Sequence, residues 1–254
     1  MPGLTPSLNG DAEDRAAWVK LCNLQRRILP QVAPKVPGYK LCLAYRPAFV
    51  VTGDYHDFFI RSDGKTGVFV GDASGHGPAA SMLMAIMRTI LRTHQVHREP
   101  GRTLTDAGRI FHDQVPSDLF MTGVYLLLEP HGRVCWAAAG HHPPLWVTRA
   151  GEAVPADFSV IGPVLGYEPE MQYKTIPCEL GIGDRMLLFT DGVWEARNEA
   201  GEPFNRLRLW QHMQFSMEDP LETAVHQLVG VVADHARGGE IEDDFTILAV
   251  ERTA

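Results

Sequence analysis

The chain has 254 residues, of which 45% are hydrophobic and 21% are charged, and its formal net charge is −8 at pH 7. This composition is typical of a globular protein, and a chain of this length can fold around one core without stabilising disulfides. The acidic balance argues against a nucleic-acid partner, because proteins bind the phosphate backbone through clustered Lys and Arg.

The cysteines and the hydropathy pattern indicate the cellular compartment of the protein. No C-x-x-C pair is present, so the sequence indicates neither a zinc ribbon nor a disulfide framework. We interpret the cysteines as reduced thiols: Cys22, Cys42, Cys135 and Cys178. No segment has the pattern of a signal peptide, and no run approaches the roughly 18 apolar residues of a membrane span. We therefore expect a soluble, cytoplasmic protein.

The hydrophobic pattern predicts helices and strands in separate blocks. Helical spacing indicates helices over 11–29, 77–96, 102–115, 205–213 and 219–236. Apolar and aromatic runs between turn signals indicate strands over 39–46, 49–60, 67–71, 120–129, 133–139, 144–148, 173–177, 185–190 and 244–251. Because strict alternation of strand and helix is missing, we expect an α+β fold with mainly antiparallel sheets covered by helices.

The chain is expected to have three parts. Residues 1–10 are rich in Pro, Gly, Ser and Asn and are predicted to be a disordered tail. Residues 11–36 are predicted to form an N-terminal helix and a Pro-rich linker, and residues 37–254 the main domain. The helix has an apolar stripe made of Trp18, Leu21, Cys22, Ile28 and Leu29. This stripe either packs on its own domain or pairs with a second copy of the chain.

Acidic residues recur where strand-like runs meet a break. They are Asp54 in "VVTGDYHDFF", Asp72 in "VFVGDASGHG", Asp191 in "MLLFTDGVWEARN", and Asp243 with Asp244 in "EIEDDFTILAV". One such residue alone would be interpreted as part of a turn, because Asp-Gly and Gly-Asp are common loop signals. The repeated context instead predicts that loops at one sheet edge bring the carboxylates together. Such a cluster favours hard cations such as Mg²⁺ or Mn²⁺.

Six blocks of the sequence resemble, in order and spacing, bacterial metal-dependent Ser/Thr protein phosphatases of the type 2C superfamily, in the SpoIIE and RsbU-like branch. They are "GDYHDFF", "VGDASGHG", "LFMTGVYLLLE", "AAAGHHPPLWV", "LLFTDGVWEARN" and "DDFTILAV". The resemblance covers roughly residues 18 to 251. It implies a β-sandwich of two antiparallel sheets flanked by helices, with two Mn²⁺ or Mg²⁺ ions at one end. The implied substrate is phosphoserine or phosphothreonine on a STAS-type anti-sigma-antagonist in partner-switching signalling.

The resemblance also implies the metal ligands. Asp72 would bridge both ions, and the other ligands would be the backbone carbonyl of Ala73 and the carboxylates of Asp54, Asp191 and Asp243. Many relatives have glycine in place of Ala73, but any residue offers a backbone carbonyl. Relatives also usually have glycine at the position of Thr52, which is not a ligand.

Histidines near these blocks are candidates for protonating the leaving serine alkoxide: His56, His76, His141 and His142. A loop histidine is more often structural, and "AGHHPPL" can be explained as a shaped turn. Because His76 lies in a block that the family shares, we assign it as a catalytic residue with Asp54 and Asp72.

Other interpretations remain open. A metal-dependent nuclease could use the same carboxylates, although the acidic chain has no evident basic groove. A pseudophosphatase that binds phosphoproteins would be expected to have lost metal ligands, and all four aspartates are present. In related proteins a segment like the first helix often follows a sensory domain. We expect that helix to be regulatory, and we expect no sensory domain on this chain because only residues 1–10 precede it.

Overall fold

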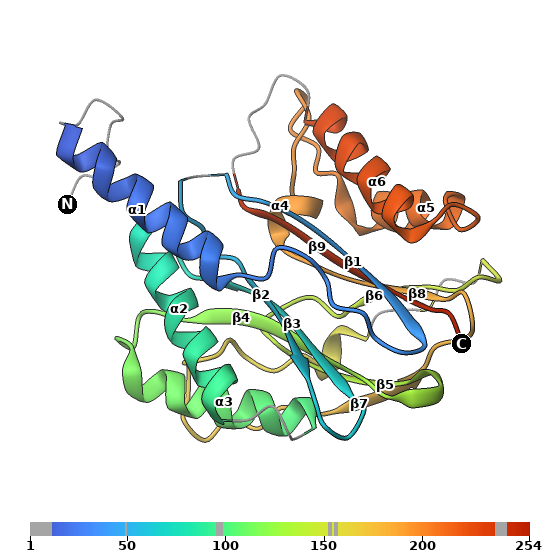
Figure 1. The fold of residues 1–254 in the computed structure, drawn as a ribbon, viewed down its shortest axis with the longest axis horizontal. Coiled ribbons are helices and arrows are strands. Elements are labelled where there is room, and N and C mark those ends of the chain that lie inside the picture. Colours follow the sequence, from blue (N-terminus) through green and yellow to red (C-terminus); the bar gives the residue numbers. More distant parts are fainter. Residues whose placement is uncertain (1–11, 49, 95–98, 152–153, 155–156, 237–242) are drawn as a thin grey trace.

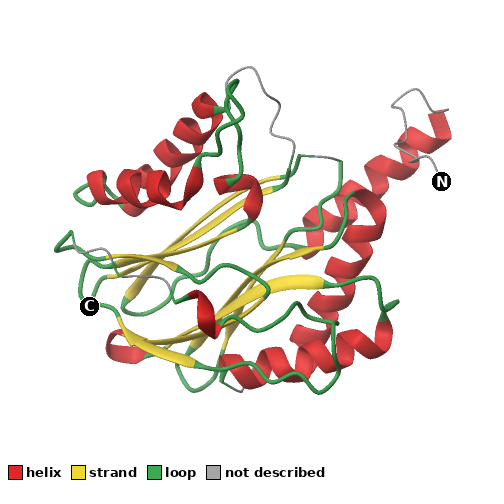
Figure 2. Ribbon diagram, turned by 180° about the vertical axis from the view of Figure 1, so that it is seen from behind, coloured by secondary structure: helices red, strands yellow, loops and turns green. Residues whose placement is uncertain are grey.

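The structure, a computed structural model, describes residues 12–48, 50–94, 99–151, 154, 157–236 and 243–254. Two antiparallel sheets face each other with helices on both outer surfaces (Figures 1 and 2), which confirms the expected sandwich. The first sheet has the order β1 (Tyr39–Arg46), β9 (Phe245–Arg252), β8 (Arg185–Phe189) and β6 (Leu145–Val147). The second has the order β2 (Tyr55–Ile60), β3 (Thr66–Ala73), β4 (Met121–Leu128), β5 (Arg133–Ala139) and β7 (Ile176–Glu179).

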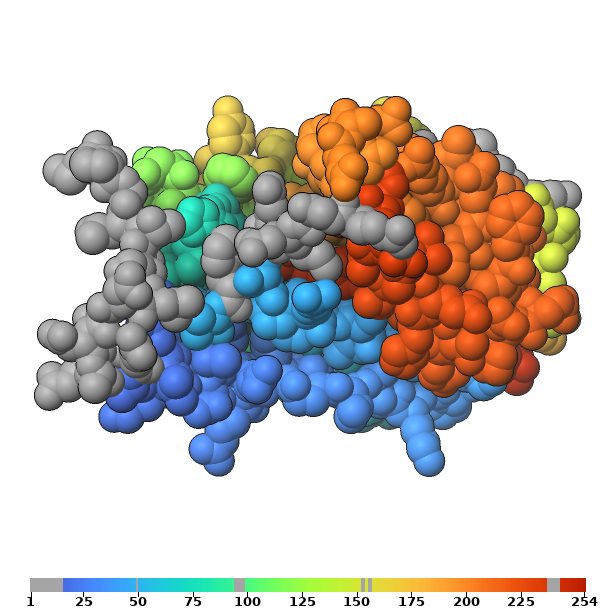
Figure 3. Space-filling model, turned by 90° about the horizontal axis from the view of Figure 1, so that it is seen from above, coloured from blue at the N-terminus to red at the C-terminus, as the bar shows by residue number. Residues whose placement is uncertain are grey.

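The helices divide between the two sheets. Helices α2 (Gly77–His94) and α3 (Pro100–Gln114) cover the β2–β7 sheet, while α5 (Asn205–Phe215) and α6 (Leu221–His235) cover the β1–β6 sheet. The short α4 (Asp191–Trp194) directly follows β8. Seen from above, α5 and α6 form the surface at one end of the molecule, and the described part of the N-terminal helix, in blue, lies toward the other (Figure 3). No helix within the described ranges is long and apolar enough to cross a membrane.

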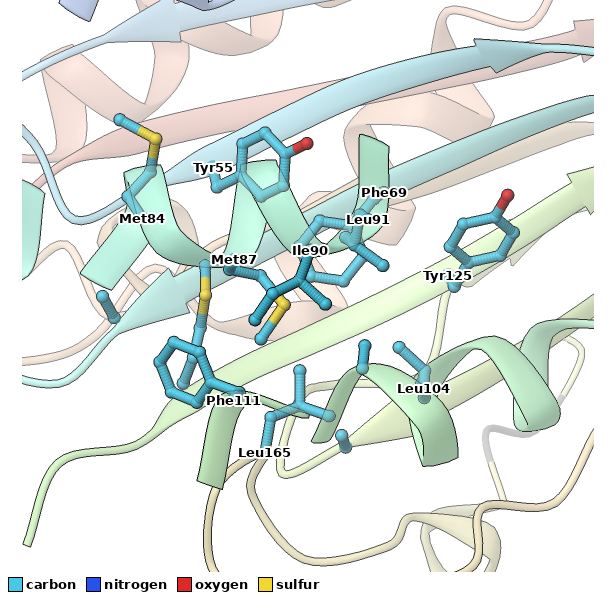
Figure 4. Close-up of a cluster of buried hydrophobic side chains, with 14 of the residues drawn as sticks. Tyr55, Phe69, Met84, Met87, Ile90, Leu91, Leu104, Phe111, Tyr125 and Leu165 are labelled. Atoms are coloured by element: carbon cyan, nitrogen blue, oxygen red, sulfur yellow. The ribbon is translucent and has the colours of Figure 1, made fainter. Parts of the chain in front are cut away.

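Alternation along the strands builds the core in layers. In β3, Val68 and Val70 point between the sheets, while Phe69 points toward α2 and α3. Phe69 and Tyr125 belong to one buried cluster with Met87, Leu104 and other side chains of this helix layer, which Figure 4 draws. The ring of Phe69 needs space over the β3–β4 pair, where Gly71 and Gly123 lie opposite each other. A Cβ on Gly123 would lie 2.5 Å from the Phe69 ring, so only glycine fits there.

The N-terminal helix α1 (Ala12–Ile28) packs on the domain through its C-terminal end. Leu29 is buried in the core below α2, and Ile28 packs against the same cluster. The buried side chain of Gln25 donates to the Thr52 carbonyl at 2.8 Å and accepts from the Thr52 backbone N–H at 2.9 Å. The helix end is therefore bonded to the loop that leads into β2.

The sequence-based boundaries differ from the structure at three places. Residues 50–54 form a loop, so β2 begins at Tyr55 rather than at residue 49. Strand β7 covers Ile176–Glu179 instead of 173–177, and α4 was not expected. The other expected helices and strands are confirmed within a few residues. The expected tail at residues 1–10 lies outside the described residues.

An ion pair fastens α2 to the edge strand β2. The Asp57 carboxylate is fully buried and accepts from both Nε and Nη2 of Arg92, with Nε at 2.8 Å from Oδ2. It also accepts from the Tyr55 hydroxyl at 2.7 Å and from the Phe58 backbone N–H at 2.8 Å. The Arg92 side chain, in contrast, is 43% exposed.

We expect the two halves of this ion pair to differ in their effect on stability. Arg92→Met leaves a fully buried carboxylate without its cation and should lower the free energy of unfolding by about 3–5 kcal/mol. Asp57→Asn leaves a half-exposed guanidinium that water can hydrate, so its cost should be smaller. Urea denaturation of both single variants and of the double variant tests this. The double variant should be more stable than Arg92→Met, and equal losses in the two single variants would contradict the asymmetry.

Candidate metal centre

The predicted aspartates all lie at one edge of the sandwich. Asp54 directly precedes β2, and Asp72 is near the end of β3, which is antiparallel to β2. Asp191 follows β8 as the first residue of α4, and Asp243 lies just before β9, which pairs with β8. Antiparallel pairing thus brings two aspartates together in each sheet. A hydrogen bond of 2.9 Å from Thr190 Oγ1 to Asp54 Oδ2 connects the two sheets at this edge.

Asp54 is the most deeply buried member of the group. Its Oδ2 accepts from the hydroxyls of Thr190 and Thr246, while its Oδ1 is buried without a hydrogen-bond partner. Burial, followed by the charges of Asp72 and Asp244, raises the pKa of Asp54 well above its usual range. A buried oxygen of this kind calls for a proton, a water molecule or a cation.

Asp72 and Ala73 direct oxygens to the same place. A Cβ on Gly53 would lie 3.0 Å from Asp72 Oδ1 and 3.1 Å from the Ala73 carbonyl oxygen, so the two oxygens share the space beside this glycine. Burial and the nearby carboxylates, led by Asp191 and Asp243, raise the pKa of Asp72 to about 8. The Ala73 carbonyl therefore lies beside the carboxylate with which it is predicted to act.

Asp191 and Asp243 are brought together by close packing of α4 on the segment before β9. A Cβ on Gly192 would lie 2.1 Å from the Asp244 carbonyl oxygen, so a larger residue would push α4 away. Burial is the main cause that raises the pKa of both carboxyls, and the Asp191 charge adds to the rise at Asp243. The charge of the exposed His76 acts in the opposite direction and lowers the pKa of Asp243.

The Asp244 carboxylate accepts hydrogen bonds from a loop, which distinguishes it from Asp243. Its Oδ1 accepts from the Ala48 backbone N–H at 2.9 Å, and its Oδ2 accepts from the Gly53 backbone N–H at 3.1 Å. Both oxygens thus hold the loop before β2. This arrangement favours Asp243 over Asp244 as the metal ligand, as the family resemblance implies.

The donor set fits a hard divalent cation. It consists of carboxylate and carbonyl oxygens, and it includes the unpartnered Oδ1 of Asp54. In the part of the chain that the structure describes, no group of three or more His, Cys, Asp or Glu side chains converges tightly enough to hold an ion by itself. Mg²⁺ commonly takes only one or two carboxylates and keeps several waters, so a looser arrangement is compatible with it. The individual ligand assignments stay predictions.

The other candidate histidines have partners outside the acidic group. His56 Nε2 donates to the Pro30 carbonyl at 2.9 Å, and the ring lies against Tyr45. His142 stacks on Phe189 and meets Trp194 edge-on, while His141 is buried between β4 and β8. The charge of His76, in contrast, acts on Asp243, a predicted ligand.

Sequence analysis missed the groups that support the carboxylates. Thr190 and Thr246 hold Asp54, Gln25 holds the preceding loop, and Gly53 provides space beside Asp72. The only sequence signal for Gly53, Thr190 and Thr246 was their position within the acidic blocks, and Gln25 lies far from those blocks in the sequence.

Known structures share this fold. The PP2C domain of SiaA from Pseudomonas aeruginosa superposes with a TM-score of 0.81 at 20% identity, covering 94% of this chain and 97% of that one. RsbX, solved in complex with magnesium, superposes with a TM-score of 0.65 at 14% identity, covering 87% and 98%. The molecule therefore has the fold of a PP2C-type phosphatase domain.

The family follows from the sequence match. Residues 62–253 match the family model described as Stage II sporulation protein E (SpoIIE), and the chain belongs to this family. It is 24% identical to the phosphoserine phosphatase RsbU of Bacillus subtilis over 91% of this chain and 68% of that protein. It is also 24% identical to protein IcfG of Synechocystis sp. over 95% of this chain. The chain spans only 42% of the length of IcfG.

Proposed function

We propose that this chain is a metal-dependent phosphatase that hydrolyses phosphoserine or phosphothreonine on a protein. The observation that carries the proposal is the gathering of Asp54, Asp72, Asp191 and Asp243 at one sandwich edge, where burial and neighbouring carboxylates raise their pKa values. Membership of the SpoIIE family and the similarity to the phosphoserine phosphatase RsbU support the same activity. The four aspartates also argue against a pseudophosphatase, which would be expected to lack ligands.

The proposed site holds two Mn²⁺ or Mg²⁺ ions. Asp72 would bind both, next to the Ala73 carbonyl, and Asp54, Asp191 and Asp243 would complete the protein ligands. When bound, such ions supply positive charge that lowers the pKa of the attacking water and offsets the charge of the phosphoryl oxygens. In this proposal His76 would give a proton to the leaving alkoxide.

The proposed substrate is the phosphorylated form of a STAS-type anti-sigma-antagonist. The resemblance to the RsbU-like branch is the basis of this assignment, and the chain would then act in partner-switching signalling that controls a sigma factor.

Loss of the bridging carboxylate should remove most of the turnover. We expect Asp72→Asn to lower kcat/KM on a phosphoserine peptide by at least about 100-fold, because changes that only support a metal ligand already cost 10–100-fold. EDTA should abolish wild-type turnover, and added Mn²⁺ or Mg²⁺ should restore it. Asp63→Asn, at an exposed turn, is the matched control and should keep wild-type rates. Turnover that resists EDTA, or that survives Asp72→Asn, would refute the proposal.

The substrate class has its own test. Initial rates on matched phosphoserine, phosphothreonine and phosphotyrosine peptides should show a clear preference for the first two, and a phosphorylated STAS-type protein should be the best substrate. A strong preference for phosphotyrosine would overturn the assignment. Activity on phosphoserine peptides together with inertness toward STAS-type proteins would remove only the named partner.

A second copy of the chain is the other proposed partner. The C-terminal end of α1 packs on its own domain, but Trp18 and Leu21 are only partly buried, and Val19 and Leu24 are each 58% exposed. Burying such side chains in a dimer would contribute about 1.5–3 kcal/mol each before association costs. We therefore propose that α1 forms a homodimer and has a regulatory role.

Negative charges on the apolar stripe of α1 should dissociate the proposed dimer. Light scattering of the wild type at high concentration should give the mass of a dimer, and Trp18→Glu with Leu21→Glu should give a monomer. Ala17→Glu with Asn23→Glu adds the same charge at exposed positions of the same helix and should leave the dimer intact. A monomeric wild type would exclude the dimer, and a dimer that survives the first pair of changes would place the interface elsewhere.

A further inference from the structure

His141 makes a polar contact with each of the two sheets. It follows β5, is 6% exposed, and has hydrogen-bond partners at both ring nitrogens. Nδ1 lies 2.9 Å from the Thr122 hydroxyl on β4, and Nε2 lies 3.0 Å from the Phe189 carbonyl oxygen on β8. The strands β4 and β8 belong to different sheets. One imidazole thus joins the two halves of the sandwich.

The chemistry of the partners fixes the state of the ring. A carbonyl oxygen can only accept, so Nε2 must carry the proton and donate to Phe189. In the neutral ring Nδ1 is then an acceptor, and the Thr122 hydroxyl donates to it. The Asp72 carbonyl, at 3.5 Å from the same hydroxyl, is too distant to compete for its single proton. Burial lowers the pKa of His141 to about 3, which is consistent with a neutral ring.

Both partners of His141 lie next to proposed metal ligands. Thr122 is directly opposite Asp72 in the β3–β4 pair. Phe189 is the last residue of β8, and it is followed by Thr190, which holds Asp54, and then by Asp191. The ring therefore connects the strand beside Asp72 to the strand that leads into Asp191.

We propose that His141 is a positioning residue that sets the spacing between the Asp72 side and the Asp191 side of the metal centre through its bonds to Thr122 and Phe189. This inference rests on the proposed metal-dependent function. His141 would not touch the ions or the substrate. It would keep the ligands of the two sheets at the distance at which both can bind the same pair of ions.

The neutral His141 ring is suited to join the two sheets beside the acidic group. The carboxylates of the two sheets repel one another in the absence of cations, which favours separation of the sheets at this edge. A Lys or Arg in place of His141 would bring a positive charge that competes with the cations. The neutral imidazole resists separation without such a charge.

Removal of one of the two bonds tests the inference with a readout that is independent of turnover. Thr122→Val removes the hydroxyl and keeps the shape of the side chain, whereas Thr122→Ser keeps the hydroxyl. The Kd for Mn²⁺ of the EDTA-stripped full chain is measured by electron paramagnetic resonance of free Mn²⁺. Urea denaturation and phosphopeptide turnover are measured in parallel. Thr66→Val, a change of the same kind at a buried position near the start of β3, is the matched control.

We expect Thr122→Val and His141→Asn to raise the Kd for Mn²⁺ by about 10-fold, the range found when residues that orient metal ligands are replaced. Thr122→Ser should stay within about twofold of the wild type, and so should Thr66→Val. Turnover of Thr122→Val should recover at saturating Mn²⁺, because ligand spacing rather than the chemical step is changed.

Other results would overturn the inference. A folded Thr122→Val protein that binds Mn²⁺ as tightly as the wild type contradicts it. The same holds if Thr66→Val loses as much affinity for an equal loss of stability, since the effect would then be general destabilisation. In both cases a wild type with EDTA-sensitive turnover leaves the proposed function standing. A wild type that neither binds Mn²⁺ nor hydrolyses phosphopeptides refutes the proposed function and this inference with it.

Discussion

Repulsion between carboxylates that share one partly buried edge is the constraint on which this structure depends. Burial and the neighbouring acidic groups raise the pKa values of Asp54 and Asp72, so in the absence of cations their ionised forms work against folding. The fold compensates with hydrogen-bond donors from the β8–β9 pair and from a loop. Thr190 and Thr246 donate to Asp54, and backbone N–H groups of the loop before β2 donate to Asp244.

The charge of the hydrogen-bond donors distinguishes the aspartates at the acidic edge from aspartates that only stabilise the fold. The hydrogen bonds described for Asp54 come from neutral hydroxyls, which leave the negative field of the edge intact for a cation. Asp57, only three residues away, has Arg92 as its partner and is neutralised by it. Two aspartates in the motif "GDYHDFF" thus serve opposite purposes, and the charge of the partner distinguishes them.

Hydrophobic periodicity in the sequence predicted the features of the fold that depend on neighbouring residues. Strand β3 and helix α2 were predicted because their periodicity matches the faces that they bury, and the aspartates were noticed because each one ends or begins a strand. The apolar Val51 favours a strand over residues 50–54, but this fully buried side chain belongs to a loop. The aromatic Tyr173 likewise favours a strand that begins at residue 173. Its ring packs beside Gly162, and the residue lies before the start of β7.

The supporting groups of the site could not be predicted, because they depend on distant pairs. Gln25 and Thr52 are 27 residues apart, whereas Thr190 and Asp54 are 136 apart and Thr246 and Asp54 are 192 apart. A sequence pattern within one window contains no information on such contacts. The packing of α1 on the loop before β2 brings the first pair together, and the docking of one sheet on the other brings the other two within hydrogen-bond distance.

The pairing of β1 with β9 has a consequence for how the protein matures. These strands pair along their whole length, from Tyr39 opposite Arg252 to Arg46 opposite Phe245, and Asp243 lies just before β9. Synthesis proceeds from the N-terminus, and contacts between distant segments form slowly during folding. A nascent chain therefore contains Asp54 and Asp72 long before it contains Asp243. The proposed metal centre could therefore be completed only after β9 has been synthesised, and binding of ions there would be a late step in the folding of each new molecule.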